Sequence, residues 1–356
     1  MQEIALLTAQ YFQQVDPSSL SLPDGPALVS PTIQSAIYEN MFNEDTAWPL
    51  PPASYQTRIL KTIIARIEES ISNPEEDEIL DSLMEKWASL LSTPKPSALE
   101  QAQKLTYIKY SAPVAFSPVS GSSSECDGTM GRRTIITSEN RSLILSAGTT
   151  GFRTWEAALH LGTFLFTTSA GSSLVANKRV LELGAGTGFL SFLCAKHLGA
   201  ESVIATDREP ALIEQIDDCI GKNTLGRTQI QAGIWEWGMP LQVPSLFEEG
   251  GRVGFDLALG ADLIYDSDIV PLLVSTIKDL FDNYSVKEFI IAATVRNEDT
   301  FRTFLDACAR NALAVEQIPF QSPPSEEQTG FFHSTSTPIR TYRVQSRVSD
   351  LDFTLG

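Results

Sequence analysis

The feature that most constrains the fold of this chain is a glycine-rich turn that follows a short apolar run. Residues 179–191 read Arg-Val-Leu-Glu-Leu-Gly-Ala-Gly-Thr-Gly-Phe-Leu-Ser. This order predicts a buried strand, a tight turn and the start of a helix. Glycine permits positive φ and lets a ligand approach the main chain closely, so the turn is a candidate binding site.

The spacing of the glycines and two acidic residues indicate which ligand the turn would bind. Gly184, Gly186 and Gly188 form a GxGxG pattern, which differs from the GxGxxG of dinucleotide-binding proteins. Glu182 precedes them, and a second predicted strand ends at Asp207, where a carboxylate is placed to hold the two hydroxyls of a ribose. Open α/β sheets bind ligands at the carboxyl ends of their strands. The unit favours S-adenosylmethionine over a nicotinamide cofactor, with plain turn residues as the alternative.

Strands and helices alternate after this turn. Apolar runs predict further strands at residues 229–234, 255–261, 288–294, 314–320 and 340–345. Helical patterns are present at residues 211–220, 269–281 and 299–310. Such alternation predicts a doubly wound parallel sheet with right-handed crossovers. No helix separates the last two strands, so one of them must run antiparallel, and we predict an α/β fold with a seven-strand Rossmann-like sheet.

The first 110 residues predict a helical N-terminal domain. Helical patterns lie at residues 4–12, 55–68 and 79–91. The second of them carries the apolar stripe of an amphipathic helix, formed by Ile59, Leu60, Ile63, Ile64 and Ile67. Because these helices must bury their apolar faces, they are expected to pack together, and the domain is a candidate for substrate recognition.

A segment rich in Ser, Pro and Gly separates this domain from the rest of the chain. Residues 111–131 have few large apolar side chains and predict a linker or a long surface loop. Residues 133–138 and 142–146 then predict a short hairpin closed by Glu139-Asn140, and a helix is expected at residues 154–166. We predict that residues 132–356 form the second domain, which holds the cofactor.

Charge and composition disfavour several classes of function. The formal net charge of −18 would repel a phosphate backbone, so we expect no nucleic-acid partner, whereas an acidic surface suits a basic protein segment. No run approaches the roughly 18 apolar residues of a membrane span, and the N-terminus lacks the basic region of a secretory signal. We expect a cytoplasmic protein that does not bind membranes.

The cysteines and histidines predict no metal site. Four cysteines are widely spaced without a CxxC pair, and the chain has only three histidines. Cys194 lies on the apolar face of the helix that follows the glycine turn, so we expect a core residue there and not a nucleophile.

A carboxylate and an aromatic residue follow the fourth predicted strand, in the motif Asp262-Leu-Ile-Tyr265. Methyltransferases that act on an adenine or amide nitrogen often carry an Asn/Asp-Pro-Pro-aromatic motif at this place, and the chain lacks it. An acid followed by an aromatic suits a cationic amine, which Asp262 would orient while Tyr265 walls the channel. The alternative is a helix-capping Asp and a core Tyr.

Three tryptophans lie near the predicted cofactor site in the sequence. Trp237 follows the third strand, where an adenine ring would stack, and Trp235 is expected to pack in the core. Trp155 opens the helix before the sheet and is placed to close over the methionine end of the cofactor.

Four runs of sequence resemble the DxxY class of seven-strand protein lysine methyltransferases. They lie at residues 148–159, 181–188, 237–238 and 262–265. Within that class, the helical extension and the Gly-Thr-Thr-Gly…Thr-Trp run resemble the enzymes that methylate elongation factor 2. The resemblance implies transfer of methyl groups from S-adenosylmethionine to a lysine of elongation factor 2, up to trimethyl-lysine. We expect the enzyme to be a monomer.

The resemblance also implies roles for individual residues. The resemblance implies that Asp262 and Tyr265 are catalytic residues that contact the target lysine. It assigns cofactor binding to Trp155, Glu182, Gly184, Ala185, Gly186, Gly188, Asp207, Trp237 and Ala261. The chain departs from related sequences in Trp235-Glu236, which stands before Trp237.

Other hypotheses stay open at this point. A methyltransferase of the same fold could act on another protein, an RNA or a small molecule, because fold alone does not choose the substrate. A protein of a different class, without catalysis, would use the helical domain and the acidic surface to bind a partner.

Overall fold

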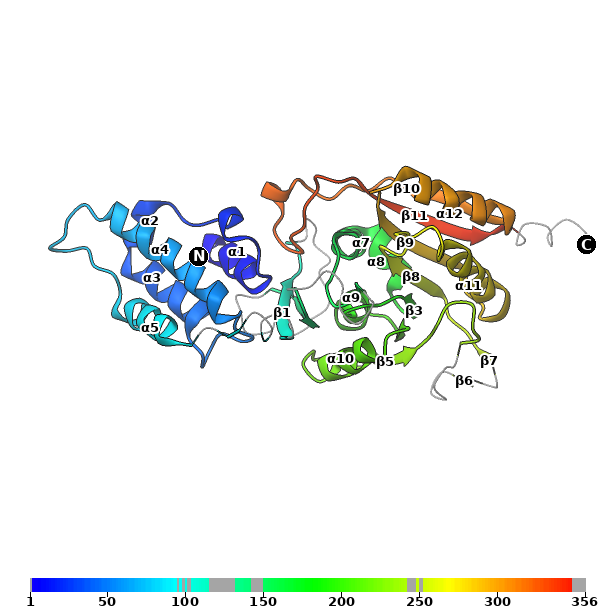
Figure 1. Cartoon of the computed structure of the whole chain (residues 1–356), viewed down its shortest axis with the longest axis horizontal. Coiled ribbons are helices and arrows are strands. Elements are labelled where there is room, and N and C mark those ends of the chain that lie inside the picture. The colour runs from blue at the N-terminus through cyan, green and yellow to red at the C-terminus, as the bar shows by residue number, and fades with distance from the viewer. Residues whose placement is uncertain are drawn as a thin grey trace, which may run out of the picture. The chain divides into compact units, whose positions relative to one another are not determined.

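The computed structural model describes residues 2–94, 96–97, 100, 104–114, 132–141, 150–241, 248–249 and 252–347. The chain divides into two compact units, Met1–Leu143 and Ile144–Gly356. Figure 1 shows the elements of both units in chain order. No helix among the described residues is long and apolar enough to cross a membrane.

The first unit is built mainly from helices. They are α1 (Gln2–Phe12), η1 (Pro17–Ser19), α2 (Gly25–Val29), α3 (Pro31–Ile37), the π-helical turn η2 (Tyr38–Phe42), α4 (Ala53–Ser70) and α5 (Asp81–Ser92). The apolar stripe of α4 is buried in a core that it shares with α1 and η2. The three helices predicted from the sequence are confirmed, whereas the short α2 and α3 had not been predicted.

The first unit also contains a two-stranded antiparallel sheet. Strand β1 (Thr106–Ser111) pairs with β2 (Thr134–Glu139), and Thr106 lies opposite Glu139. The expectation of helix up to residue 110 is therefore wrong for β1, whose Thr, Tyr and Ile residues favour a strand. Glu139 is a paired strand residue and closes no turn. Residues 142–146, the predicted partner of this strand, lie outside the described residues, as do residues 115–131 of the predicted linker.

The buried carboxylate of Glu139 connects several side chains of this small sheet. It accepts hydrogen bonds from the Tyr110 hydroxyl at 2.6 Å, from Thr137 Oγ1 at 2.8 Å and from Arg141 Nε at 3.0 Å. Arg141 also donates to the carbonyl of Gln13 at 2.7 Å, next to α1. Because these bonds join β2 to the first unit, the strand belongs there, although composition placed residues from 132 onward with the second domain.

The second unit is a seven-strand sheet, as the sequence predicted. Its strands are β3 (Arg179–Leu183), β4 (Ser202–Asp207), β5 (Gln229–Ile234), β8 (Leu257–Ala261), β9 (Glu288–Thr294), β10 (Leu313–Ile318) and β11 (Ile339–Ser346). Their order is β10-β11-β9-β8-β3-β4-β5, and β11 runs antiparallel to both of its neighbours. The reversed strand and the Rossmann-like architecture are confirmed. Two further short strands, β6 (Glu248–Glu249) and β7 (Arg252–Val253), pair with each other.

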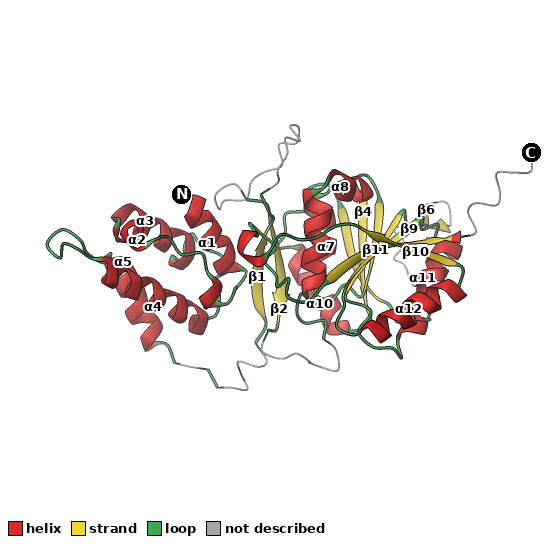
Figure 2. Cartoon of the chain, turned by 90° about the horizontal axis from the view of Figure 1, so that it is seen from above, coloured by secondary structure: helices red, strands yellow, loops and turns green. Residues whose placement is uncertain are grey.

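Helices cover both faces of this sheet (Figures 1 and 2). One face carries α7 (Glu156–Thr167), α9 (Phe189–His197) and α10 (Pro210–Ile220), and the other carries α11 (Val270–Asn283) and α12 (Glu298–Arg310). The short helix α8 (Ser169–Val175) packs against α7, and the 3-10 turn η4 (Ser325–Glu327) lies between β10 and β11. Cys194 of α9 is fully buried with a free thiol, as predicted for a core residue.

The strand order positions the site. Strands β3 and β8 are neighbours, and the connection after β3 leads to β4 on one side, whereas the connection after β8 leads to β9 on the other side. Open α/β sheets bind their ligands in the crevice that such a reversal creates. The glycine turn after β3, Asp207 at the end of β4 and Asp262 after β8 therefore meet at one edge.

Candidate active site

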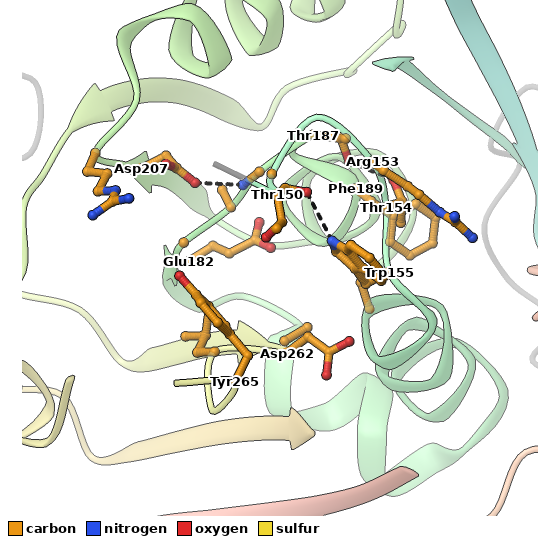
Figure 3. A pocket seen from close by; sticks show the side chains of 18 of the residues that line it. Thr150, Arg153, Thr154, Trp155, Glu182, Thr187, Phe189, Asp207, Asp262 and Tyr265 are labelled. Atoms are coloured by element: carbon orange, nitrogen blue, oxygen red, sulfur yellow. Dashed lines mark hydrogen bonds between the residues drawn. The ribbon is translucent and has the colours of Figure 1, made fainter. Parts of the chain in front are cut away.

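A cavity of about 340 Å³ opens at the carboxyl edge of the sheet (Figure 3). Ligand pockets in proteins are commonly of this size or larger. Every predicted site residue except Gly188 lines it. They are Trp155, Glu182, Gly184, Ala185, Gly186, Asp207, Trp237, Ala261, Asp262 and Tyr265. Gly188 is instead the N-cap of α9.

The glycine turn forms a cradle that side chains would fill. Gly184 and Gly186 have φ values of 57° and 53°. A Cβ atom on Gly184 would lie 2.7 Å from Leu263 Cδ2, and one on Gly186 would lie 3.0 Å from the carbonyl oxygen of Gly151. The turn therefore exposes bare backbone to the cavity, as binding of a nucleoside cofactor requires.

Glu182 is a buried carboxyl in the floor of the cavity. Only 4% of its surface is exposed, and its Oε2 accepts a hydrogen bond from the backbone N–H of Ser191 at 2.8 Å and another from the Ser191 hydroxyl. Burial raises the pKa of this carboxyl to about 8, and the neighbouring Asp207 adds to the rise. A cation that enters the cavity would favour the ionised form.

Asp207 ends β4 and braces the glycine turn. Its Oδ2 accepts from the N–H of Gly186 at 3.0 Å, and its Oδ1 accepts from the N–H of Glu209 at 3.2 Å. Burial raises the pKa of Asp207, whereas these backbone bonds oppose the rise. The N–H of Ala185 donates to the carbonyl of Thr206 at 2.8 Å, so the turn is tied to β4 at two points.

The two tryptophans after β5 occupy different environments. Trp235 is 3% exposed, belongs to the sheet core and donates from its indole N–H to the carbonyl of Met239 at 2.8 Å. Its predicted packing role is confirmed, although it also touches the cavity. Trp237 is partly buried against the same core, and its ring lies close to Gly184.

Trp155 is the N-cap of α7 and lines the same cavity. Its indole N–H donates to the carbonyl of Thr150 at 3.0 Å, a bond drawn in Figure 3. The guanidinium groups of Arg153 and Arg296 each lie 5.3 Å from the ring. Two cation–π contacts therefore hold the indole at the cavity wall.

Asp262 stands directly after β8 in a left-handed conformation, with φ 56°. Asp is among the few residues other than glycine that adopt this conformation readily. Its Oδ1 accepts from the N–H of Thr294 at 2.9 Å, and its Oδ2 accepts from Thr294 Oγ1 at 3.1 Å and from Arg296 Nη2 at 3.3 Å. These three donor atoms belong to Thr294, the last residue of β9, and to Arg296 beyond it. The carboxylate therefore caps no helix. Burial raises its pKa, and the contacts with Thr294 and Arg296 oppose the rise.

Tyr265 lies at the rim of the cavity. It is 56% exposed, so the alternative of a core tyrosine is wrong. Partial burial nevertheless raises the pKa of its hydroxyl. Figure 3 shows the rings of Tyr265 and Trp155 with the carboxylate of Asp262 around one cavity, which places two aromatic walls and an acid together.

Three arginines in the cavity wall were missed by the sequence analysis: Arg153, Arg208 and Arg296. Arg208 follows β4 directly, and Arg296 stands two residues after the end of β9. Their positions after strand ends, the same signal that identified Asp207 and Asp262, could have revealed them. Among the described residues, no group of three His, Cys, Asp or Glu side chains is arranged to hold a metal ion.

Comparison with known proteins identifies the chemistry. A family model described as lysine methyltransferase matches residues 143–311. The chain is 41% identical over 328 residues to the protein-lysine N-methyltransferase EFM3 of Chaetomium thermophilum, covering 92% of this chain and 94% of that protein. It is 30% identical over 295 residues to EFM3 of Saccharomyces cerevisiae, covering 77% of this chain and 78% of that protein. It is also 27% identical over 198 residues to the protein-lysine N-methyltransferase EEF2KMT of Mus musculus, covering 52% of this chain and 56% of that protein.

The site and these relatives agree on cofactor and reaction. A bare glycine cradle, a buried acid beneath it and an acid at the end of the next strand suit a cofactor that carries an ammonium and a ribose. The chain belongs to the lysine methyltransferase family and is an S-adenosylmethionine-dependent protein-lysine N-methyltransferase.

Proposed function

We propose that this enzyme methylates a lysine of elongation factor 2, up to trimethyl-lysine, and that it works in the cytoplasm as a monomer. The observation that carries the proposal is the carboxylate of Asp262 beside the half-exposed ring of Tyr265 at the mouth of the cavity. The choice of elongation factor 2 rests on the Gly-Thr-Thr-Gly…Thr-Trp run and on the helical first unit, and the likeness to EEF2KMT supports it.

Four residues around the cradle are proposed to hold the cofactor. Glu182 would bind the ammonium of its methionine part, since a buried acid gains most from a cation. Asp207 would accept hydrogen bonds from the ribose hydroxyls. Trp237 would stack on the adenine, and Trp155 would close over the methionine end. When bound, the cofactor supplies an electrophilic methyl group on a positively charged sulfur.

The target lysine must become neutral before it can act as a nucleophile. Its ammonium, with an ordinary pKa of about 10.4, has no lone pair at neutral pH. Burial and nearby positive charge lower that pKa, so solvent can take the proton without a dedicated strong base. The neutral nitrogen would then be able to accept the methyl group that the bound cofactor would supply.

Asp262 and Tyr265 act mainly by positioning in this proposal. The carboxylate attracts the ammonium to the cavity and orients the nitrogen, and the tyrosine ring excludes water from one side. Correct placement and desolvation account for much of the rate in such reactions. The net charge of −18 suits a basic segment of a protein substrate, and the helical first unit is the proposed recognition module.

The proposal is tested by labelling. The purified enzyme is incubated with tritiated S-adenosylmethionine and an extract from cells that lack it, and the products are separated by size and analysed by mass spectrometry. We expect one labelled protein of the size of elongation factor 2 that contains methyl-lysine. Label in RNA or metabolites, or in a protein of another size, would contradict the proposed substrate.

The role of Asp262 is tested in the same assay with Asp262→Asn, because Asn also tolerates the left-handed conformation. Loss of the charge that orients the ammonium should lower kcat on the order of 100-fold, with the cofactor Kd unchanged within about twofold. Asp266→Asn is the matched control, since Asp266 is exposed and, within the described part of the chain, its side chain hydrogen-bonds locally, to the N–H of Asp268. Near-normal turnover by Asp262→Asn would refute the role.

A further inference from the structure

One guanidinium in the second unit is shared between two carboxylates. Arg296 Nη2 lies 3.3 Å from Asp262 Oδ2 and 3.6 Å from Glu156 Oε2. Asp262 is nine-tenths buried as a side chain, whereas Arg296 is 47% exposed. The half-exposed cation therefore contacts one oxygen of the carboxylate that the lysine ammonium is proposed to reach.

Glu156 can hold this cation without Asp262. It lies in the first turn of α7, and its other oxygen is 3.6 Å from Arg153 Nη2. Arg296 also lies 5.3 Å from the ring of Trp155, which Arg153 contacts from another position at the same distance. A guanidinium that left Asp262 would thus keep an ionic partner and an aromatic surface.

We propose that Arg296 is a positioning residue that exchanges partners: it neutralises Asp262 in the lysine-free enzyme and transfers to Glu156 when the target ammonium binds Asp262. The proposal rests on the proposed role of Asp262 toward lysine. In the lysine-free enzyme this ion pair opposes the rise in the pKa of Asp262 that burial causes. Glu156 then receives the guanidinium, which lowers the free-energy cost of its release from Asp262.

The exchange predicts opposite effects of two neighbouring substitutions. Removing Arg296 removes a competitor of the lysine, so the KM for the protein substrate should fall. Removing the charge of Glu156 leaves Arg296 with Asp262 alone, so the KM should rise. Because half-exposed ion pairs contribute little, each change should be on the order of two- to fivefold. kcat at saturating substrate should stay within about twofold in both variants.

The test compares Arg296→Gln, Glu156→Gln and the double variant, at saturating cofactor, with elongation factor 2 purified from cells that lack the enzyme. In the double variant the exchanging guanidinium is absent, so the loss of the Glu156 charge should have no further effect and the KM should equal that of Arg296→Gln. Arg302→Gln is the matched control, because Arg302 is an exposed residue of α12 whose ionic partner among the described residues is Asp299. Arg296→Met, which retains an aliphatic stem on Trp155, repeats the measurement should Arg296→Gln fold poorly.

The outcomes separate this proposal from the substrate proposal. A raised KM in both single variants, or additive effects in the double variant, would overturn the exchange and indicate a structural role for both residues. If the wild-type enzyme leaves elongation factor 2 unmethylated, the substrate proposal fails. The same variants are then compared on the protein that the wild-type enzyme labels in the extract. The direction of the KM changes then still decides whether Arg296 exchanges partners.

Discussion

Glu182 should couple cofactor binding to pH. Burial raises the pKa of its carboxyl from 4.5 to about 8, and Asp207 adds to this rise, while the two hydrogen bonds from Ser191 oppose it. In the free enzyme near pH 7 the carboxyl is therefore mostly protonated. If Glu182 binds the cofactor ammonium as proposed, the bound state favours the carboxylate, and binding releases a proton.

The size of the effect follows from that pKa. With a pKa of about 8, the ionised fraction in the free enzyme rises from about 1% at pH 6.0 to about 24% at pH 7.5. A fully ionised bound state then lowers the cofactor Kd about 24-fold over this range, or ~1.9 kcal/mol of binding free energy. The range ends at pH 7.5 because the α-amino group of the cofactor loses its charge near its own pKa of about 8.

Calorimetric titrations at four pH values from 6.0 to 7.5, in two buffers of different ionisation enthalpy, measure both the Kd and the protons released. Glu182→Gln closely matches the shape of the protonated acid and still offers Ser191 an acceptor, so its Kd should be weak and independent of pH. Glu201→Gln, at an exposed position before β4, should behave as the wild type. A wild-type Kd that does not change with pH, or an equal slope in Glu182→Gln, would refute the reasoning.

The same pKa shift predicts the stability of the free enzyme. The folded pKa lies above the unfolded value, so the stabilising contribution is complete below about pH 4.5 and is lost as the pH rises through about 8. Glu182→Gln cannot ionise. Its Tm relative to the wild type should therefore become more favourable between pH 6 and pH 9, and a constant difference would contradict the shift.

Two further substitutions test the cradle and the core. Gly184→Ala places a Cβ 2.7 Å from Leu263 Cδ2 at φ 57°, so we expect the cofactor Kd to rise on the order of tenfold. Gly199→Ala is the control: at φ 67° with open space around it, the substitution should cost about 1 kcal/mol of stability and leave the Kd unchanged. Equal cofactor Kd values for the two variants, measured by calorimetry, would contradict this prediction. Burial lowers the pKa of His160 to about 4, so the stability of the protein should fall as the pH drops from 6.5 toward 4. His160→Phe should reduce this dependence of Tm on pH in thermal unfolding. An unchanged pH dependence would rule out His160 as its cause.

Local periodicity predicted most of the second unit. The run before the glycines, the apolar strands and the amphipathic helices between them are patterns of neighbouring residues, and each matches an observed element within a few residues. The absence of a helix between the last two strands was enough to predict the antiparallel β11, because consecutive strands without a crossover helix must reverse.

The first unit shows where this reasoning failed. Strand β1 was expected to be helical, and its partner β2 lies more than twenty residues further along the chain. No local pattern near residues 106–111 predicts that pairing, to which the buried Glu139 and its three side-chain donors contribute. Short helices such as α2 and α3 carry too few residues for a periodic pattern to be visible.

At the site, the linear sequence specified the acids and glycines, because strand ends and tight turns have local signatures. Tertiary structure alone decided how charged those acids are. The raised pKa of Glu182 arises from burial beneath the turn, and Asp262 shares Arg296 with Glu156 because β8, β9 and α7 bring together residues more than a hundred positions apart. Burial and long-range Coulomb interactions depend on the packed protein as a whole, and no local pattern of residues encodes them.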